Sequence, residues 1–110
     1  MQIEELISEW RNNVEAYAKA KANSDYLKEF RKSKKAMLVV EAEQKGRKTA
    51  LERESYAYTH KEYIALLEAL RIATEEAESL RYRMMIAQER VNIWRTKQAN
   101  NRKELDSYGG

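Results

Sequence analysis

The sequence contains no cysteine and no proline, and only 3 of its 110 residues are glycine. Gly109 and Gly110 end the chain, so Gly46 is the only interior glycine. Sandwiches and barrels need many tight turns, which depend on glycine and proline, so this composition excludes both. The lack of cysteine also excludes a disulfide scaffold. What remains is an all-helical protein.

Several functional classes also lack the residues that they require. His60 is the only histidine, there is no glycine-rich phosphate loop, and carboxylate pairs such as Glu75 and Glu78 have no second cluster beside them. We therefore expect no enzyme, no catalytic residue, no cofactor and no metal. The longest strictly apolar run, Ala36 to Val40, is far shorter than the roughly 20 residues of a membrane span. The acidic start of the chain is unlike a signal peptide, so we expect a cytoplasmic protein without a membrane partner.

The apolar pattern predicts one helical domain built as a long helical hairpin with coiled-coil-like packing. Its first element covers residues 1–44, as one helix or as a helix pair kinked at Asn23-Ser24-Asp25, where short polar side chains compete for backbone hydrogen bonds. The segment around Gly46 ends this element. A short connector helix over 49–58 and a long helix over 60–105 follow.

Two capping boxes mark the starts of the later helices. Thr49 with Glu52 opens the connector helix, and Thr59 with Glu62 opens the long helix, since each threonine precedes a glutamate by three residues. His60 then lies in the capping region of the long helix, which is its ordinary explanation.

The long helix carries two apolar stripes. The first has the 3.5-residue spacing of a coiled-coil seam and becomes polar at Gln98 and Asn101; its apolar members are Tyr63, Leu66, Leu70, Ala73, Ala77, Leu80, Met84, Ala87, Val91 and Trp94. The second consists of Ile72, Met85, Ile86 and Ile93. One helical partner cannot cover both stripes, and a lone hairpin buries too little surface. We therefore expect these four residues to form the interface of a homo-oligomer, a ring or bundle of at least three copies.

The first helix carries an apolar stripe of its own. Its members are Ile3, Leu6, Ile7, Trp10, Val14, Tyr17, Leu27, Phe30, Met37, Leu38 and Val40. We expect Trp10 and Trp94 to lie in the core. Tyr26 could stack on a nucleic-acid base, but core packing is the more ordinary role.

The net charge of +3 conceals alternating blocks of opposite sign. Residues 1–18 carry −3, residues 19–35 carry +5, residues 54–80 carry −4 and residues 81–103 carry +6. An antiparallel hairpin is expected to bring the two basic blocks toward one end. Such blocks either bind a polyanion or pair with acidic surfaces of neighbouring subunits.

The candidate phosphate-binding residues are the cations of the first basic block and of the turn that follows it. They are Lys28, Arg31, Lys32, Lys34, Lys35, Lys45, Arg47 and Lys48. The cations of the second block flank the seam of the long helix, and they could extend this surface or pair across subunits: Arg81, Arg83, Arg90, Arg95, Lys97 and Arg102.

The run Tyr26 to Leu38 (YLKEFRKSKKAML), followed by Val40 to Lys45 (VEAEQK), resembles the UvsY recombination mediators of T-even phages. That family also joins a basic helix to a short connector and a long amphipathic helix. The segment Tyr63 to Arg102, which ends in IWRTKQANNR, looks like small uncharacterised phage proteins from replication and recombination gene clusters. The resemblance implies a ring-forming, phage-encoded protein that binds single-stranded DNA in the host cytoplasm and helps to load a recombinase.

Two functional classes follow from these observations. The leading one is an oligomeric, sequence-nonspecific single-stranded DNA-binding accessory of recombination, with a recombinase, an annealing protein or a single-strand-binding protein as its partner. The alternative is a non-enzymatic coiled-coil adaptor, a virion-assembly protein or an inhibitor of a host protein. Ion pairs on the lysines of residues 28–35 would favour the adaptor, and a continuous lysine face would favour DNA binding.

Overall fold

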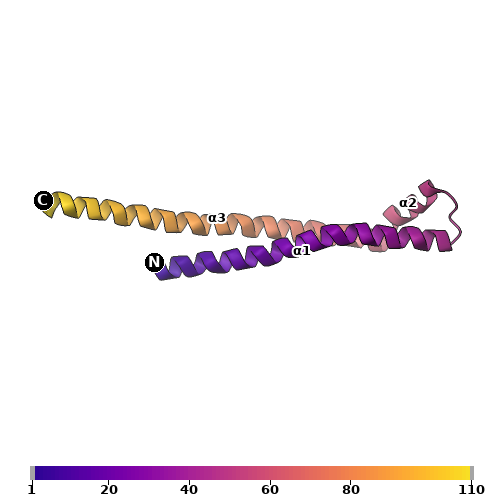
Figure 1. Ribbon diagram of the computed structural model, residues 1–110, viewed down its shortest axis with the longest axis horizontal. Helices are drawn as coiled ribbons and strands as arrows, with labels where there is room; N and C mark the ends of the chain where they lie inside the picture. The colour runs from indigo at the N-terminus through magenta and orange to yellow at the C-terminus, as the bar shows by residue number, and fades with distance from the viewer. Residues whose placement is uncertain (1, 110) are drawn as a thin grey trace. The chain divides into compact units, whose positions relative to one another are not determined.

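The computed structural model describes residues 2–109, and it describes the side chains of residues 2–107. This part of the chain forms three α-helices, which are α1 (Ile3–Gln44), α2 (Ala50–Thr59) and α3 (Lys61–Gly109) (Figure 1). None of these residues lies in a strand. The predicted all-helical class is confirmed.

By its contacts the chain divides into two compact units. The connector unit is Lys19–Ala77, which contains all of α2 and the adjoining parts of α1 and α3. The terminal unit combines Met1–Ala18 with Glu78–Gly110. Both long helices therefore contribute to both units.

In each unit α1 packs against α3. Within the connector unit, the Ser24 and Thr74 hydroxyls lie 3.1 Å apart, and Lys34 Nζ lies 2.8 Å from a carboxylate oxygen of Glu62. The later residue of α1 contacts the earlier residue of α3, so the two segments run antiparallel. This arrangement agrees with the predicted helical hairpin.

The seam of α3 is the one that the sequence predicts. Every predicted apolar position from Tyr63 to Trp94 is buried or half-buried, whereas Gln98 and Asn101 are exposed. Five of these positions are buried outright: Tyr63, Ala73, Ala77, Ala87 and Val91. The small alanine side chains allow the backbones of the two helices to approach closely.

The inner face of α1 differs from the predicted stripe. Ile7, Val14, Met37 and Val40 of that stripe are exposed, so they lie outside the inner face. The inner face instead recurs at alternating steps of three and four residues and includes several polar side chains: Ile3, Leu6, Trp10, Asn13, Tyr17, Ala20, Ser24, Leu27, Arg31, Lys34, Leu38 and Glu41. Polar contacts across the pair satisfy some of them, as with Ser24 and Lys34.

Of the two alternatives for residues 1–44, the structure has the single helix, because α1 is continuous through Gln44. The Ser24 hydroxyl contacts Thr74 on α3, and the Asp25 carboxylate pairs with Lys21 one turn earlier at 3.3 Å. With their side chains engaged in this way, neither residue competes for the helix backbone.

Gly46 ends α1, as predicted. It adopts a φ of +86°, a left-handed conformation that glycine reaches without steric cost. The amide of Gly46 donates to the carbonyl of Glu43, and the amide of Arg47 donates to the carbonyl of Ala42, each at 3.0 Å. This pair of bonds is a Schellman motif, which satisfies the last carbonyls of the helix.

Of the two predicted capping boxes, only the first forms. The Glu52 amide donates to the Thr49 hydroxyl at 3.1 Å, and the Thr49 amide donates back to the Glu52 carboxylate. The Thr59–Glu62 box is wrong, because α2 continues through Thr59, whose hydroxyl donates to the Ser55 carbonyl. His60 caps α3 instead, and its Nδ1 accepts from the Glu62 amide at 3.1 Å.

All three helices meet in the connector unit, where Leu38 of α1, Ala57 of α2 and Tyr63 of α3 form a buried cluster. Leu38 is only 3 % exposed. The cluster holds the connector helix against the pair of long helices.

Truncating Leu38 should destabilise the protein strongly. Leu38→Ala removes buried methyl groups and leaves a cavity, which costs about 2–5 kcal/mol in a well-packed core. Leu51→Ala is the matched control because Leu51, on α2, is 75 % exposed, and we expect it to cost less than about 0.5 kcal/mol. Urea unfolding followed by circular dichroism measures both. Equal costs for the two variants would contradict this account of the core.

Candidate nucleic-acid and subunit interfaces

Two lysines of the first basic block are used within the connector unit. Lys34 pairs with Glu62 of α3 at 2.8 Å. Lys35 lies 3.6 Å from a carboxylate oxygen of Glu54 on α2, and its ammonium group sits 4.6 Å from the centre of the Tyr58 ring. Both lysines are half-buried. They join α1 to its neighbours and are poorly placed to neutralise phosphates.

The other three cations of this block have different surroundings. Lys28 is exposed, and the structure of residues 2–107 gives it no carboxylate within 4.0 Å. Lys32 contacts only Glu29 on its own helix, at 3.4 Å, with both side chains largely in solvent. Arg31 lies half-buried on the inner face of α1, and its Nε is buried without a hydrogen-bond partner. Lys28 and Lys32 are therefore the accessible members of the block.

The predicted cations near the α1–α2 turn surround one aromatic ring. Lys45 and Arg47 lie 5.5 and 5.9 Å from the centre of the Tyr56 ring. The Tyr56 hydroxyl in turn donates to the Glu41 carboxylate at 3.0 Å. Lys48 is exposed, and its backbone amide donates to Glu52 at 2.9 Å. All three cationic side chains remain exposed.

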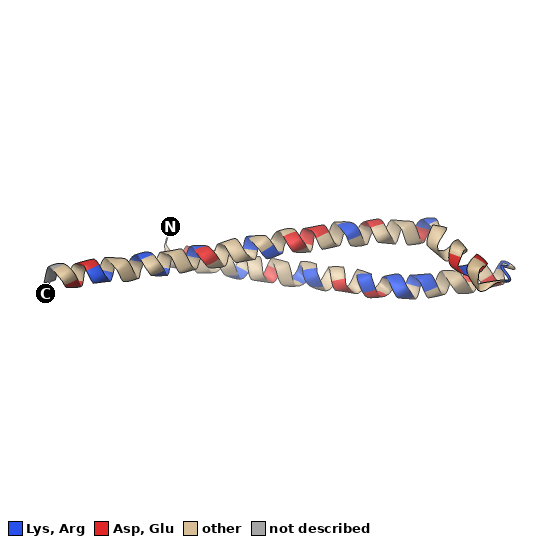
Figure 2. Ribbon diagram, turned by 90° about the horizontal axis from the view of Figure 1, so that it is seen from above, with Lys and Arg blue, Asp and Glu red and all other residues tan. Residues whose placement is uncertain are grey.

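The second basic block belongs to the terminal unit (Figure 2). Arg90 pairs with Glu9 of α1, with the closest atoms 2.6 Å apart, and Arg81 pairs with Glu78 one turn earlier on α3. The remaining five cations are exposed, and no carboxylate in the described part of the chain lies within 4.0 Å of them: Arg83, Arg95, Lys97, Arg102 and Lys103.

The expected convergence of the two basic blocks is wrong. Block 19–35 lies in the connector unit with most of the acidic residues of 54–80, and block 81–103 lies in the terminal unit with the acidic residues of 1–18. Antiparallel pairing places opposite charges side by side, as the Lys34–Glu62 and Glu9–Arg90 pairs show. This arrangement avoids the repulsion that two facing basic blocks would produce.

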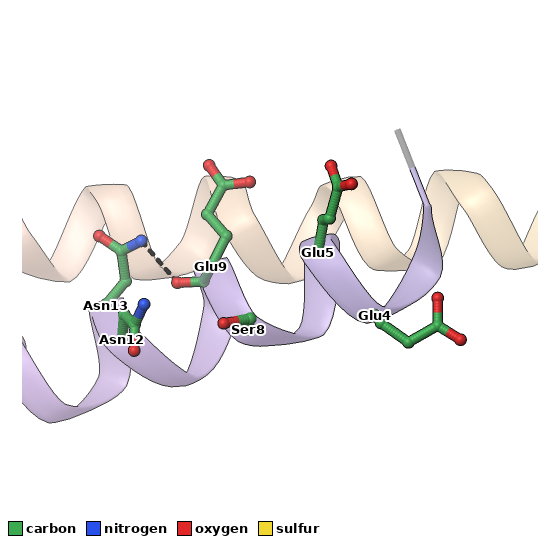
Figure 3. Close-up of a pocket in the computed structure, with 6 residues that line it drawn as sticks. All are labelled: Glu4, Glu5, Ser8, Glu9, Asn12 and Asn13. Atoms are coloured by element: carbon green, nitrogen blue, oxygen red, sulfur yellow. Dashed lines mark hydrogen bonds between the residues drawn. The ribbon is translucent and has the colours of Figure 1, made fainter.

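The first turns of α1 carry an acidic hollow (Figure 3). Glu4, Glu5 and Glu9 line it together with Ser8, Asn12 and Asn13, and the Asn13 amide donates to the Glu9 carbonyl at 2.8 Å. In the described residues, no group of three or more histidine, cysteine or acidic side chains is arranged to hold a metal ion. None of the described helices combines the length and apolarity that a bilayer crossing needs.

All four residues predicted for a subunit interface are about half exposed or more. Ile86 is the most exposed at 61 %, and Ile72, Met85 and Ile93 also lie at the surface of α3. A second apolar stripe, which the sequence analysis missed, lies on α1 in the connector unit; Tyr26, Met37 and Val40 are exposed and Phe30 is half-buried. Its recurrence at steps of four, seven and three residues is a signal that could have separated it from the seam.

The aromatic residues are more accessible than expected. Tyr26 is 63 % exposed, so its expected core position is wrong; its ring stacks on Phe30 with 5.9 Å between centroids. Trp10 and Trp94 are half-buried. Trp94 lines a shallow groove with Leu6, Arg90, Ile93 and Lys97.

Comparison with known proteins gives no family. No protein-family model matches the chain, and no significant match was found among curated proteins or among solved structures. The resemblance to the UvsY mediators stays a prediction.

The Lys34–Glu62 pair makes stability depend on pH. Lys34 holds the pKa of Glu62 below its ordinary value of 4.5, through a hydrogen bond and the charge of its ammonium group. A carboxylate with a lowered pKa stabilises the fold above that ordinary value, and the contribution is lost as the pH falls through the lowered pKa. Glu62→Gln should therefore be less stable than the wild type at pH 7 and equally stable at an acidic pH below the lowered pKa.

The control for this prediction is Glu15→Gln. Glu15 is exposed, and no cation in residues 2–107 lies within 4.0 Å of it. The difference in stability between Glu15→Gln and the wild type should be the same at both pH values. A Glu62→Gln deficit of the same size at both pH values would contradict the role of the pair.

Proposed function

We propose that the chain is a self-associating, non-enzymatic protein that binds single-stranded DNA without sequence preference as an accessory of recombination. The observation that carries the proposal is the set of α3 cations that have no carboxylate partner within residues 2–107, of which Arg95, Lys97, Arg102 and Lys103 lie within nine residues. Cations that no carboxylate neutralises are free to release counterions from phosphates, which drives nonspecific binding to nucleic acid.

The end of α3 suits this role geometrically. The seam positions Gln98 and Asn101 are exposed there, so α3 is accessible on its inner side as well as its outer side. Trp94 borders this segment in a groove that also contains Lys97. An accessible aromatic ring beside cations is the combination with which proteins hold unpaired bases and their backbone.

The contact set proposed here differs from the one that the sequence favoured. Lys34 and Lys35 have partners on other helices, so their part in DNA binding is expected to be small. Lys28 and Lys32 stay candidates, as do Lys48 and the two cations beside Tyr56.

The biological setting comes from the resemblance to the UvsY mediators. On that resemblance we propose a role in phage recombination, with the host cytoplasm as the location and a recombinase, annealing protein or single-strand-binding protein as the partner. Self-association is proposed from the exposed apolar residues of α3, since contiguous apolar surface commonly marks protein contacts.

One observation favours the second candidate, a coiled-coil adaptor. The Lys34–Glu62 and Lys35–Glu54 pairs show that part of the basic surface stabilises the fold. If the remaining cations only keep the protein soluble, the exposed stripes would contact a partner protein and DNA would not bind.

Two charge-matched double variants test the DNA contact. Arg102→Gln/Lys103→Gln removes two unpaired cations, and Lys34→Gln/Lys35→Gln removes two cations that take part in ion pairs. Fluorescence anisotropy with a labelled single strand should show that the first variant binds more weakly. The slope of log K against log salt concentration should also be shallower by about 1.4. The second variant should bind nearly as well as the wild type.

Equal losses in both variants would show that only net charge matters, and a loss confined to the second would return the site to the first basic block. Either result would contradict the proposed contact set. Circular dichroism checks that both variants stay helical.

A further inference from the structure

The connector unit presents an apolar face made by two helices. Tyr26, Phe30, Met37 and Val40 lie along α1, and Ile72 lies on α3. The Ser24–Thr74 contact fixes the register of the antiparallel helices, so Tyr26 of α1 lies roughly opposite Ile72 of α3. Each of these residues lies one position before an inner-face residue of its helix, so in an antiparallel pair they all point to the same side. Together they form a face broad enough to receive another helix.

The terminal unit presents a narrower apolar stripe. Ile86 and Ile93 lie seven residues apart on α3, with Arg83 and Lys97 beside them, and all four side chains are exposed. This stripe has the width of a single helix.

On α3 the charges beside Ile72 and beside Ile86 differ in sign. Glu68, Glu75 and Glu76 flank Ile72 on this helix, where Arg71 pairs with Glu68 and Glu75. The α1 half of the connector-unit face adjoins the first basic block, residues 19–35. In the terminal unit the stripe is flanked mainly by arginine and lysine. The α3 part of the connector-unit face therefore complements the terminal stripe.

The order of charges along α3 selects one direction of docking. If Ile72 of one copy lies opposite Ile86 of another and the helices run antiparallel, Glu75 comes opposite Arg83. With parallel helices in the same register, Glu75 would come opposite Glu89. The antiparallel arrangement attracts and the parallel one repels.

We infer that the occupant of the connector-unit face is a second copy of this chain, whose α3 docks antiparallel with its Ile86 against Ile72 and its Arg83 against Glu75 and Glu76. The inference rests on the self-association proposed above and adds the surface, the direction and the register. An antiparallel pair of identical helices has a two-fold axis, so both copies make the same contact. Copies then associate in pairs, whereas the sequence alone suggested three or more.

Reciprocal charge reversal tests the contact. Glu75→Lys/Glu76→Lys and Arg83→Glu should each be monomers of about 13 kDa by light scattering, because like charges then face each other across the contact. An equimolar mixture of the two variants should recover the mass of the wild-type assembly, since each now offers the charge that the other needs. The triple variant that carries all three changes should also assemble.

Ile86→Glu tests the apolar part of the contact, and Leu51→Glu is its control. Both residues are apolar and exposed, but Leu51 lies on α2, outside both surfaces. Ile86→Glu should dissociate the assembly, and Leu51→Glu should leave it intact.

A wild-type monomer, or two charge variants that stay apart when mixed, would overturn the inference. These masses are measured without DNA, so this test of self-association does not depend on whether the protein binds DNA. Anisotropy of the monomeric variants on a single strand shows separately whether the cations of α3 bind DNA.

Discussion

The antiparallel packing of α1 against α3 is the constraint on which every other feature depends. It buries the seam of α3 from Tyr63 to Val91 and brings acidic and basic segments together within each unit. This packing determines which charges form ion pairs within the molecule and which stay exposed to a ligand. The Lys34–Glu62 and Glu9–Arg90 pairs belong to the fold. The exposed cations after Trp94 take no part in such pairs within residues 2–107, so they are available to a ligand, as are Lys28 and Lys48.

The predictable parts of the fold are those in which an apolar residue occupies each inner position or a complete capping motif stands in the sequence. The α3 seam was predicted because each inner position up to Trp94 is apolar, and the Thr49 cap because its box is complete in the sequence. The inner face of α1 was mispredicted because Ser24 and Lys34 are polar and their partners on α3 lie far away in the sequence. The pairing of Lys34 with Glu62 could not be predicted for the same reason, because an ion pair between residues 28 positions apart has no local signal in the sequence.

The exposed surface of the chain includes a cationic part and an apolar part. Cations dominate the end of α3, and apolar side chains form the broad face of the connector unit and the stripe through Ile86. Self-association through the apolar surfaces would bring the cationic segments of two copies onto one particle. Several weak phosphate contacts then act together, because binding at one segment raises the effective concentration of the next. Pairing of copies and nonspecific affinity for a flexible polyanion would thus support each other.

The most direct test of the account is the affinity of the wild-type protein for a labelled single-stranded oligonucleotide and for the matching duplex, each titrated at several salt concentrations. We expect tight binding at low salt that weakens steeply as salt rises and that favours the single strand. If the protein does not bind at low salt, the proposed DNA binding is wrong and the cations of α3 are solubilising charge on an adaptor.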